Sequence, residues 1–379
     1  MKKVGLITFH ESNNYGTNLQ AFALQESIKG FGYDCEIINY NRKKLKEEVK
    51  DSKFNKVRVL VNKYGITKIG KYLKYKNIYN NNLLAFSNFR KDYYNRSVKK
   101  YYCYEQLCED QSEYDAFICG SDMIWSVDRS DNIDIYLLKF ADKYKRISYA
   151  PSFGSNTIPV KMEKLYKDAL CEFNSLSCRE QSGVDIIKKL TKRKAQLVLD
   201  PTLILHSDKW LDFNTLIIEE DYILCYLFEG INENVKKLVE DVAKSMKCKI
   251  VTIPMSFDDI DKDYICPKVC GPKEFVSLFR GAKYVFTNSY HGMLFSIINN
   301  KPFSIFRREC YSKVASYETR IESLLDLLGL SDRFIDSSTI FTDKILSIDY
   351  SHANNILENE RKLSLQYLKE SLEKSLNEE

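Results

Sequence analysis

Patterns that bind metal ions or build disulfide frameworks are missing from this 379-residue sequence. Its eleven cysteines form no CxxC pair, and the closest spacings, Cys103/Cys108 and Cys266/Cys270, have no histidine nearby. Others lie in apolar runs, such as Cys119 in AFICG and Cys225 in YILCYLF. We therefore expect buried free thiols in a reducing compartment, no metal site and no cofactor.

Long apolar runs and a strong charge are missing as well. The apolar stretch from Val4 to Phe9 is too short for a secretory signal, and no other run is long enough to span a bilayer. The formal net charge is only +5, and the basic residues belong to no known nucleic-acid-binding motif. We expect a cytoplasmic protein with no nucleic-acid partner, whose membrane contact, if it has one, is peripheral.

What the sequence does contain is an alternation of apolar strands and amphipathic helices. Residues 4–8, 18–29 and 35–39 read as strand, helix and strand, which predicts a parallel sheet. The same series continues with strands at 115–119, 146–150, 175–179 and 197–200 and helices at about 160–173 and 182–190. A second series has strands at 222–228, 249–253, 283–287 and 303–306 and helices at 232–246, 272–281, 289–299 and 320–328.

These series predict an α/β fold with two Rossmann-like domains facing a cleft. We place the N-terminal domain at 1–200 and the C-terminal domain at 201–345, with the boundary at Asp200-Pro201-Thr202. Residues 346–379 read as a C-terminal helix that can pack back on the N-terminal domain. Residues 41–110, rich in Lys, Asn and Tyr, read as a basic helical insertion rather than sheet.

Two candidate ligand sites follow strands of the first series. Asn14, Tyr15 and Gly16 lie in the loop after the first strand, where ligands bind in open α/β sheets. The loop lacks GxGxxG, so a dinucleotide is not indicated, and a polar turn with a helix cap is the alternative. Ser121 and Asp122 follow the strand at 115–119, and Trp125 is a candidate to stack on a sugar ring. The alternative there is a strand end that caps a helix.

Arg179 ends another strand and is a candidate to bind a carboxylate or phosphate through two hydrogen bonds. An internal salt bridge, for example to Glu180, is equally compatible with the sequence. The motif TNSYHGM provides Ser289 as a helix cap and places Tyr290 and His291 in the first turn of the next helix. His291 is the histidine best placed for proton transfer, although a purely structural role is the alternative.

A basic cluster follows this helix: Arg307, Arg308, Lys313 and Arg320. It could bind an anionic small substrate, with a solvated basic surface as the alternative.

An ordered set of motifs resembles the polysaccharide pyruvyl transferase family over about residues 1–330. The motifs are GLITFHESNNYGTNLQAFALQ, ICGSDMIW, ISYAPSFG, CREQSG, VLDPTLIL, GPKEFVSLF, TNSYHGMLFSIINNKPF and RIESLLDLLGL. The resemblance implies a GT-B-like fold and transfer of pyruvate from phosphoenolpyruvate to a sugar as a cyclic ketal. Because no set of metal ligands appears in the sequence, we expect this reaction to need no metal ion. It also implies a basic catalytic trio, matched here by His291, Arg179 and, with altered spacing, Lys313.

The acceptor that this resemblance implies is a lipid-diphosphate-linked sugar of a cell-surface polysaccharide. Residues 41–76 carry thirteen Lys or Arg against three acidic residues, so we expect that this stretch can dock on the anionic inner face of the membrane. The alternatives are a GT-B glycosyltransferase that uses a nucleotide sugar and a non-catalytic carbohydrate-assembly protein.

Overall fold

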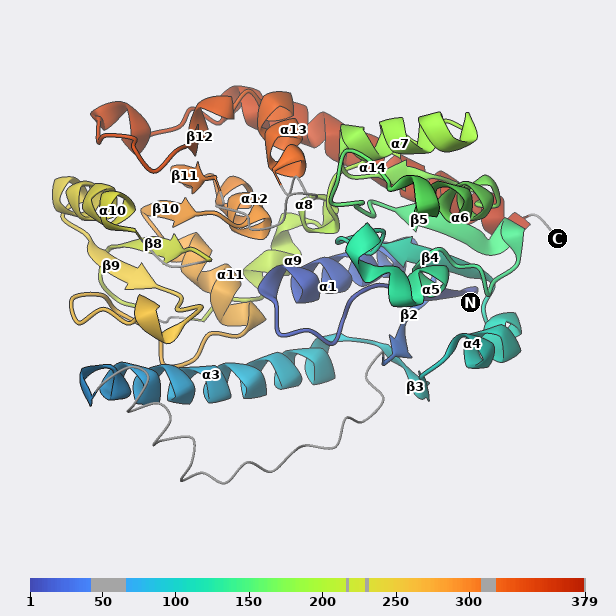
Figure 1. Cartoon of the computed structure of the whole chain (residues 1–379), viewed down its shortest axis with the longest axis horizontal. Helices are drawn as coiled ribbons and strands as arrows, with labels where there is room; N and C mark the ends of the chain where they lie inside the picture. The colour runs from blue at the N-terminus through green and yellow to red at the C-terminus, as the bar shows by residue number, and fades with distance from the viewer. Residues whose placement is uncertain (42–65, 216–217, 229–231, 308–317, 378–379) are drawn as a thin grey trace.

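Two parallel β-sheets with helices on their faces form the molecule (Figure 1). A computed structural model describes residues 1–41, 66–215, 218–228, 232–307 and 318–377. We call the part of the chain that carries β1 to β7 the N-terminal half and the part that carries β8 to β12 the C-terminal half. The fold is therefore the mixed α/β architecture with parallel sheets that the alternating pattern predicts.

The first sheet has the order β3-β2-β1-β4-β5, and all its neighbouring strands are parallel. The strand order reverses between β1 and β4, which is the switch point of a Rossmann-type sheet. A small parallel pair, β6 with β7, lies beside β5. The strands are β1 (Lys3–Ile7), β2 (Asp34–Tyr40), β3 (Arg96–Tyr101), β4 (Ala116–Gly120), β5 (Arg146–Tyr149), β6 (Ser177–Cys178) and β7 (Gln196–Leu197).

The second sheet has the order β12-β11-β10-β8-β9 and is also parallel throughout. Its switch point lies between β8 and β10, as in flavodoxin-like sheets. β8, β10 and β11 are buried along their whole length, which explains their continuous apolar runs. The strands are β8 (Tyr222–Tyr226), β9 (Lys249–Thr252), β10 (Tyr284–Thr287), β11 (Phe303–Phe306) and β12 (Phe334–Ile335).

Helices connect the strands and bury their apolar sides against the sheets. The α-helices are α1 (Tyr15–Gly30), α3 (Ile66–Tyr93), α4 (Tyr104–Asp110), α5 (Ile133–Tyr136), α6 (Val160–Cys171), α7 (Gln181–Thr191), α8 (Pro201–Ile204), α9 (Ser207–Leu211), α10 (Glu233–Met246), α11 (Pro272–Gly281), α12 (Tyr290–Ile298), α13 (Thr319–Leu328) and α14 (Ser351–Asn377). Short 3-10 turns lie at Gln111–Glu113, Val127–Asn132, Lys143–Lys145, Phe257–Asp259, Ser331–Arg333 and Asp343–Leu346.

The prediction that residues 41–110 form a helical insertion without sheet is wrong in one respect. α3 and α4 are helical, but β3 pairs with β2 and extends the first sheet at its edge. Three consecutive residues of β3, 98–100, are exposed, and two of them are lysines. Charged residues are common on edge strands, so β3 lacks the apolar run that would have indicated it. Residues 42–65, with most of the basic stretch, lie outside the described residues.

The long helix α3 joins the two halves. It runs along the bottom of Figure 1, below the second sheet and the start of α1. Tyr75 donates a hydrogen bond to the Met255 carbonyl oxygen at 2.9 Å, and the Asn82 side chain accepts one from the Cys270 amide at 2.7 Å. Near the other end of α3, Arg90 donates to the Ser12 carbonyl oxygen in the loop after β1. α3 therefore fixes that loop relative to the C-terminal half.

The last helix, α14, also contacts both halves. Tyr350, just before α14, donates a hydrogen bond to the Lys301 carbonyl oxygen at 2.7 Å. Further along, Tyr367 donates to the Ser148 carbonyl oxygen in β5 at 2.9 Å, and the Ser364 hydroxyl accepts from the Leu199 amide. The end of α14 accordingly lies beside the N-terminal half (Figure 1).

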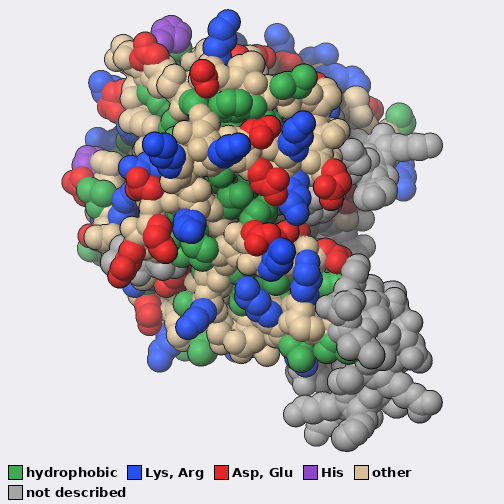
Figure 2. All heavy atoms as spheres, turned by 90° about the vertical axis from the view of Figure 1, so that its left-hand side faces the viewer, with side chains coloured by type: hydrophobic (Ala, Val, Ile, Leu, Met, Phe, Trp, Pro, Cys, Tyr) green, Lys and Arg blue, Asp and Glu red, His purple; other side chains and the backbone are tan. Residues whose placement is uncertain are grey.

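Charges of both signs are mixed on the face where α10 and the start of α3 lie. Figure 2 shows blue and red side chains side by side there, without a continuous patch of one sign. Ion pairs such as Lys236–Asp261 at 3.1 Å account for part of this mixture. Such exposed pairs contribute little to stability, so the fold depends mainly on its apolar core.

The packing of α14 on the core predicts a position-dependent loss of stability. Leu368 is fully buried, whereas Leu363 on the same helix is 49% exposed. Leu368→Ala should lower the free energy of unfolding by about 2–5 kcal/mol because it leaves a cavity. Leu363→Ala, the control, should change it by no more than about 0.5 kcal/mol. Urea unfolding followed by circular dichroism measures both, and equal losses would contradict the packing described.

Candidate active site

A cavity of about 550 Å³ lies between the two halves. Its walls are formed by residues that follow β1, β2 and β4 in the N-terminal half and β8 and β10 in the C-terminal half. The switch points of both sheets therefore open into one cavity. Ligands of open α/β sheets bind at such positions, which makes this cavity the candidate active site.

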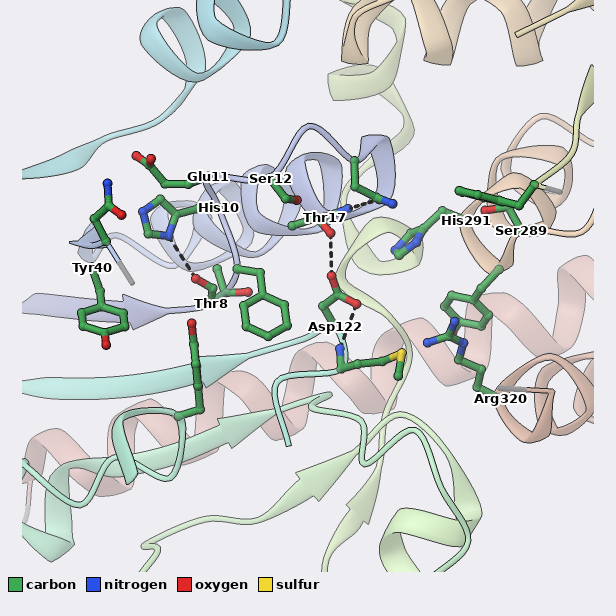
Figure 3. A pocket seen from close by; sticks show the side chains of 17 residues that line it. Thr8, His10, Glu11, Ser12, Thr17, Tyr40, Asp122, Ser289, His291 and Arg320 are labelled. Carbon is green, nitrogen blue, oxygen red and sulfur yellow. Dashed lines mark hydrogen bonds between the residues drawn. The ribbon is translucent and has the colours of Figure 1, made fainter. Parts of the chain in front are cut away.

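The N-terminal wall begins at the cap of α1. The Asn14 side chain accepts a hydrogen bond from the Thr17 amide at 3.1 Å, so α1 starts at Tyr15, three residues earlier than predicted. The Thr17 hydroxyl donates to Asp122 at 2.7 Å. Asp122 follows β4 in a left-handed backbone conformation, with φ of 66°. This hydrogen bond connects the start of α1 to the residue that follows the end of β4 (Figure 3).

The C-terminal wall is the first turn of α12. The Ser289 hydroxyl accepts a hydrogen bond from the Gly292 amide, which starts the helix and fixes Tyr290 and His291 in its first turn. His291 reaches across to the N-terminal half, where its ring lies against α1 at Gly16. A Cβ atom at Gly16 would be only 2.0 Å from Nδ1 of His291. Glycine is therefore required at this position for the two halves to approach each other.

The buried carboxylate of Asp200 lies at the junction of the halves. It is 2.9 Å from Nη1 of Arg179 and 3.6 Å from Nε2 of His291. It also accepts hydrogen bonds from the Ser121 hydroxyl at 3.2 Å and from the amide and hydroxyl of Thr202. Burial alone would raise the pKa of Asp200, but His291, Arg179 and the Thr202 amide outweigh it and lower that pKa well below its ordinary value. Asp200 is thus ionised at neutral pH.

Asp200 is not among the site residues that the sequence patterns predict. Asp200-Pro201-Thr202 reads as a domain boundary, and the structure does show Asp200 capping α8. An acidic residue within the otherwise apolar run VLDPTLIL was the available signal. Its interpretation as a functional group required the positions of Arg179 and His291.

Arg179 and Arg320 lie near the same tyrosine ring but in different environments. Their guanidinium carbons are 4.8 Å and 5.1 Å from the centre of the Tyr290 ring. The Arg179 side chain is fully buried, pairs with Asp200, has Glu180 at 3.8 Å, and does not line the cavity. Arg320 lines the cavity. Burial and the charge of Arg179 lower the pKa of Arg320 to about 10, so Arg320 remains charged at neutral pH.

The cavity brings together part of the set of residues predicted from the sequence. The predicted residues that line it are Asn14, Asp122, Ser289, Tyr290, His291 and Arg320. Gly16 and Ser121 do not line the cavity. Gly16 lies against the His291 ring, and Ser121 donates a hydrogen bond to Asp200. Lys313 and Arg308 lie outside the described residues.

Three predicted site residues need correction. Trp125 is fully buried and donates a hydrogen bond to the Tyr136 carbonyl oxygen, so it cannot stack on a sugar ring. Tyr15 is buried between the halves, stacked on Phe275 with ring centres 4.5 Å apart. Arg307 does not line the cavity, and its side chain is 56% exposed and paired with Glu318 and Glu322. Aromatic and basic residues next to strand and helix ends have many partners available, and the sequence alone does not show which of them they contact.

Among the described residues, neither the pattern of a metal site nor that of a membrane-spanning helix is present. Within the described ranges, no group of three or more His, Cys, Asp or Glu side chains is arranged to hold a metal ion. No helix in the described part of the chain is both long and apolar enough to cross a membrane.

The contact between Gly16 and His291 predicts an effect of one methyl group. Gly16→Ala must displace the imidazole, so we expect the free energy of unfolding to fall by about 1–3 kcal/mol through overpacking. Gly30→Ala on the same helix is the control, because a Cβ atom there meets nothing within 4 Å. Urea unfolding compares the two variants. If Gly16→Ala is as stable as Gly30→Ala, the described approach of α1 to His291 is incorrect.

Comparison with known proteins agrees with this architecture. The UDP-GlcNAc 2-epimerase from Methanocaldococcus jannaschii is 10% identical, with a TM-score of 0.50 over 94% of this chain and 92% of that chain. The S. aureus MnaA-UDP co-structure is 9% identical, with a TM-score of 0.50 over 96% of this chain and 90% of that one. The glycosyltransferase SnogD from Streptomyces nogalater gives 8% identity and a TM-score of 0.45 over 98% and 99% of the two chains. No curated protein matches the sequence.

At such low identities the two structures with a TM-score of 0.50 show the fold alone, which is GT-B-like. The family assignment comes from the sequence. The family model described as polysaccharide pyruvyl transferase matches residues 14–309, a range that begins at the cap of α1 and includes Arg179, Asp200 and His291. The chain therefore belongs to the polysaccharide pyruvyl transferase family and is a transferase of GT-B-like fold.

Proposed function

We propose that this transferase moves the pyruvyl group of phosphoenolpyruvate onto two hydroxyl groups of a sugar, forming a cyclic ketal and releasing phosphate. The proposed acceptor is a lipid-diphosphate-linked precursor of a cell-surface polysaccharide. The observation that carries the proposal is the grouping of His291 and Arg320 in one cavity wall, with the Asp200 carboxylate behind His291. A proton donor and a fixed cation are the two groups that this donor requires.

The chemistry follows from the charges of phosphoenolpyruvate. Its carboxylate and phosphate are anionic, and Arg320, charged at neutral pH, supports binding of one of them at the C-terminal wall. A proton added to the methylene carbon makes the adjacent carbon electrophilic. The first sugar hydroxyl forms a C–O bond there, the C–O bond to phosphate breaks, and the second hydroxyl closes the ketal. In the net reaction the sugar loses two hydroxyl protons. One of them replaces the proton that was added to the methylene carbon, and the other leaves with phosphate.

Each side chain has a proposed role in these steps. His291 supplies the proton to the methylene carbon, and Asp200 holds its ring in place at 3.6 Å. Arg179 acts as a positioning residue through Asp200 and Tyr290, since it is buried and outside the cavity wall. Lys313, the third member of the trio implied by the resemblance, stays a proposal from sequence.

The direct experiment is incubation of the purified protein with phosphoenolpyruvate and a panel of lipid-linked sugars, followed by mass spectrometry. We expect a product whose mass increases by one pyruvate ketal, with one phosphate released per product. A parallel panel of nucleotide sugars tests the glycosyltransferase alternative. Turnover of a nucleotide sugar without turnover of phosphoenolpyruvate would overturn the proposal.

Two variants test the roles within the same assay. His291→Ala should lower kcat by about a hundredfold or more because the proton donor is lost. Arg320→Gln should raise the KM for phosphoenolpyruvate at least about tenfold, since a charge-assisted contact contributes roughly 1.5–3 kcal/mol. Arg307→Gln is the matched control, because its guanidinium is held by Glu318 outside the cavity. Unchanged kinetics in His291→Ala would remove this residue from the mechanism.

A further inference from the structure

A second histidine, His10, lines the same cavity at the end opposite His291. Figure 3 shows His10 near Glu11 and Tyr40, whereas His291 lies near Ser289 and Arg320. His10 belongs to the loop between β1 and α1 and is only 3% exposed. The reaction steps described above leave it without a role.

The orientation of the His10 ring leaves one nitrogen without a partner. Nδ1 is 3.0 Å from the Thr8 carbonyl oxygen, and a carbonyl oxygen can only accept, so Nδ1 carries the proton and donates it. Nε2 then carries a lone pair in the neutral ring. It is buried and has no hydrogen-bond partner among the described residues. Buried acceptors are nearly always paired, so an unpaired one in a cavity wall indicates a ligand group that donates a hydrogen bond.

Burial keeps the His10 ring neutral. Burial lowers the pKa of His10 below its ordinary value, and the charges of Arg96 and Arg90 act in the same direction, against Glu11 and the Thr8 hydrogen bond. The lone pair on Nε2 is therefore present at neutral pH, as a base requires.

The surroundings of His10 suit a neutral ring with hydroxyl groups rather than an anion. Phe9, Tyr40 and Tyr136 line this end of the cavity, and the Phe9 and Tyr136 rings meet edge to face with centres 5.0 Å apart. Amphipathic aromatic side chains of this kind present apolar faces with polar edges. Among the described lining residues, Arg320 at the other end is the only Lys or Arg, and Glu11 adds a carboxylate at this end.

We propose that His10 is the acceptor-side base of the transfer reaction and that its end of the cavity binds the sugar. The inference rests on the proposed function. As the first hydroxyl oxygen bonds to the phosphate-bearing carbon, its O–H bond breaks and the proton passes to Nε2 of His10. His291 gives a proton to the methylene carbon in the same addition. The two histidines together account for one proton taken from the hydroxyl and one delivered to the new methyl group.

Two substitutions separate the functions of the two nitrogens. His10→Asn retains an amide where Nδ1 lies, and so the hydrogen bond to Thr8, but removes the group at Nε2. His10→Gln places an amide oxygen near Nε2, which can accept a hydrogen bond but is not a base at neutral pH. His352→Asn, an exposed position on α14, is the control.

With phosphoenolpyruvate and an acceptor that the wild-type protein uses, His10→Asn should lower kcat by about a hundredfold or more. Its KM for phosphoenolpyruvate should remain near the wild-type value. His10→Gln should keep the KM for the acceptor but not recover kcat. Near-normal kcat in His10→Asn or full recovery in His10→Gln would overturn the role as a base. A matching loss of donor affinity and thermal stability in His10→Asn would assign His10 a purely structural role instead.

If the wild-type protein transfers no pyruvyl group, that result by itself overturns the proposed function. A binding experiment then still tests whether the His10 end of the cavity binds a sugar. The chain has four histidines, so protein labelled with ¹⁵N-histidine gives a spectrum in which His10 is assigned by its loss in His10→Asn. We expect His10 to be protonated at Nδ1 and its Nε2 resonance to shift when a methyl hexopyranoside from a panel of common sugars is added. Protonation at Nε2 instead, or no shift with any member of the panel, would overturn the acceptor site.

Discussion

The carboxylate of Asp200 is shared between a cation of the N-terminal half and a histidine of the C-terminal half, and the geometry of the cavity depends on this contact. Arg179 approaches it at 2.9 Å and His291 at 3.6 Å, all within the protein interior. Removing one partner of a buried ion pair leaves an uncompensated charge, which typically costs about 3–5 kcal/mol. The ion pair therefore holds Arg179 and Asp200 together, and the carboxylate lies 3.6 Å from His291 where α12 approaches α1.

This approach continues through apolar packing. Tyr15 and Phe22 of α1 pack on Phe275 and Trp210, so a single core cluster extends across both halves. α3 and α14 add hydrogen bonds that connect the halves on two further sides. Contacts outside the cavity therefore hold the two halves together. They fix the positions of the two cavity walls relative to each other.

The two ends of the cavity differ in chemistry. The end formed by the C-terminal half carries Arg320 beside Tyr290 and His291, whereas the end formed by the N-terminal half carries His10 among aromatic rings. The proposed anionic donor and the proposed neutral, hydroxyl-bearing acceptor match these two environments, respectively. Binding of both in one cavity would convert a bimolecular encounter into a reaction within one complex.

The sequence by itself determined the alternation of strands and helices, the parallel sheets and the strand-end positions of Asp122, Arg179 and His291. These features depend on local periodicity and on caps such as Asn14 and Ser289, which a linear pattern contains. The sequence did not predict β3, because an edge strand with exposed lysines has no apolar periodicity.

Only the tertiary structure decided which strand ends meet. In the folded chain Trp125 lies in the core and Arg307 at the surface. Asp200 lies between Arg179 and His291. Strand order and the contact between two sheets arise from packing of residues far apart in the chain, and no local pattern encodes them. For the same reason, only the positions of the described residues show that none of them bonds to Nε2 of His10.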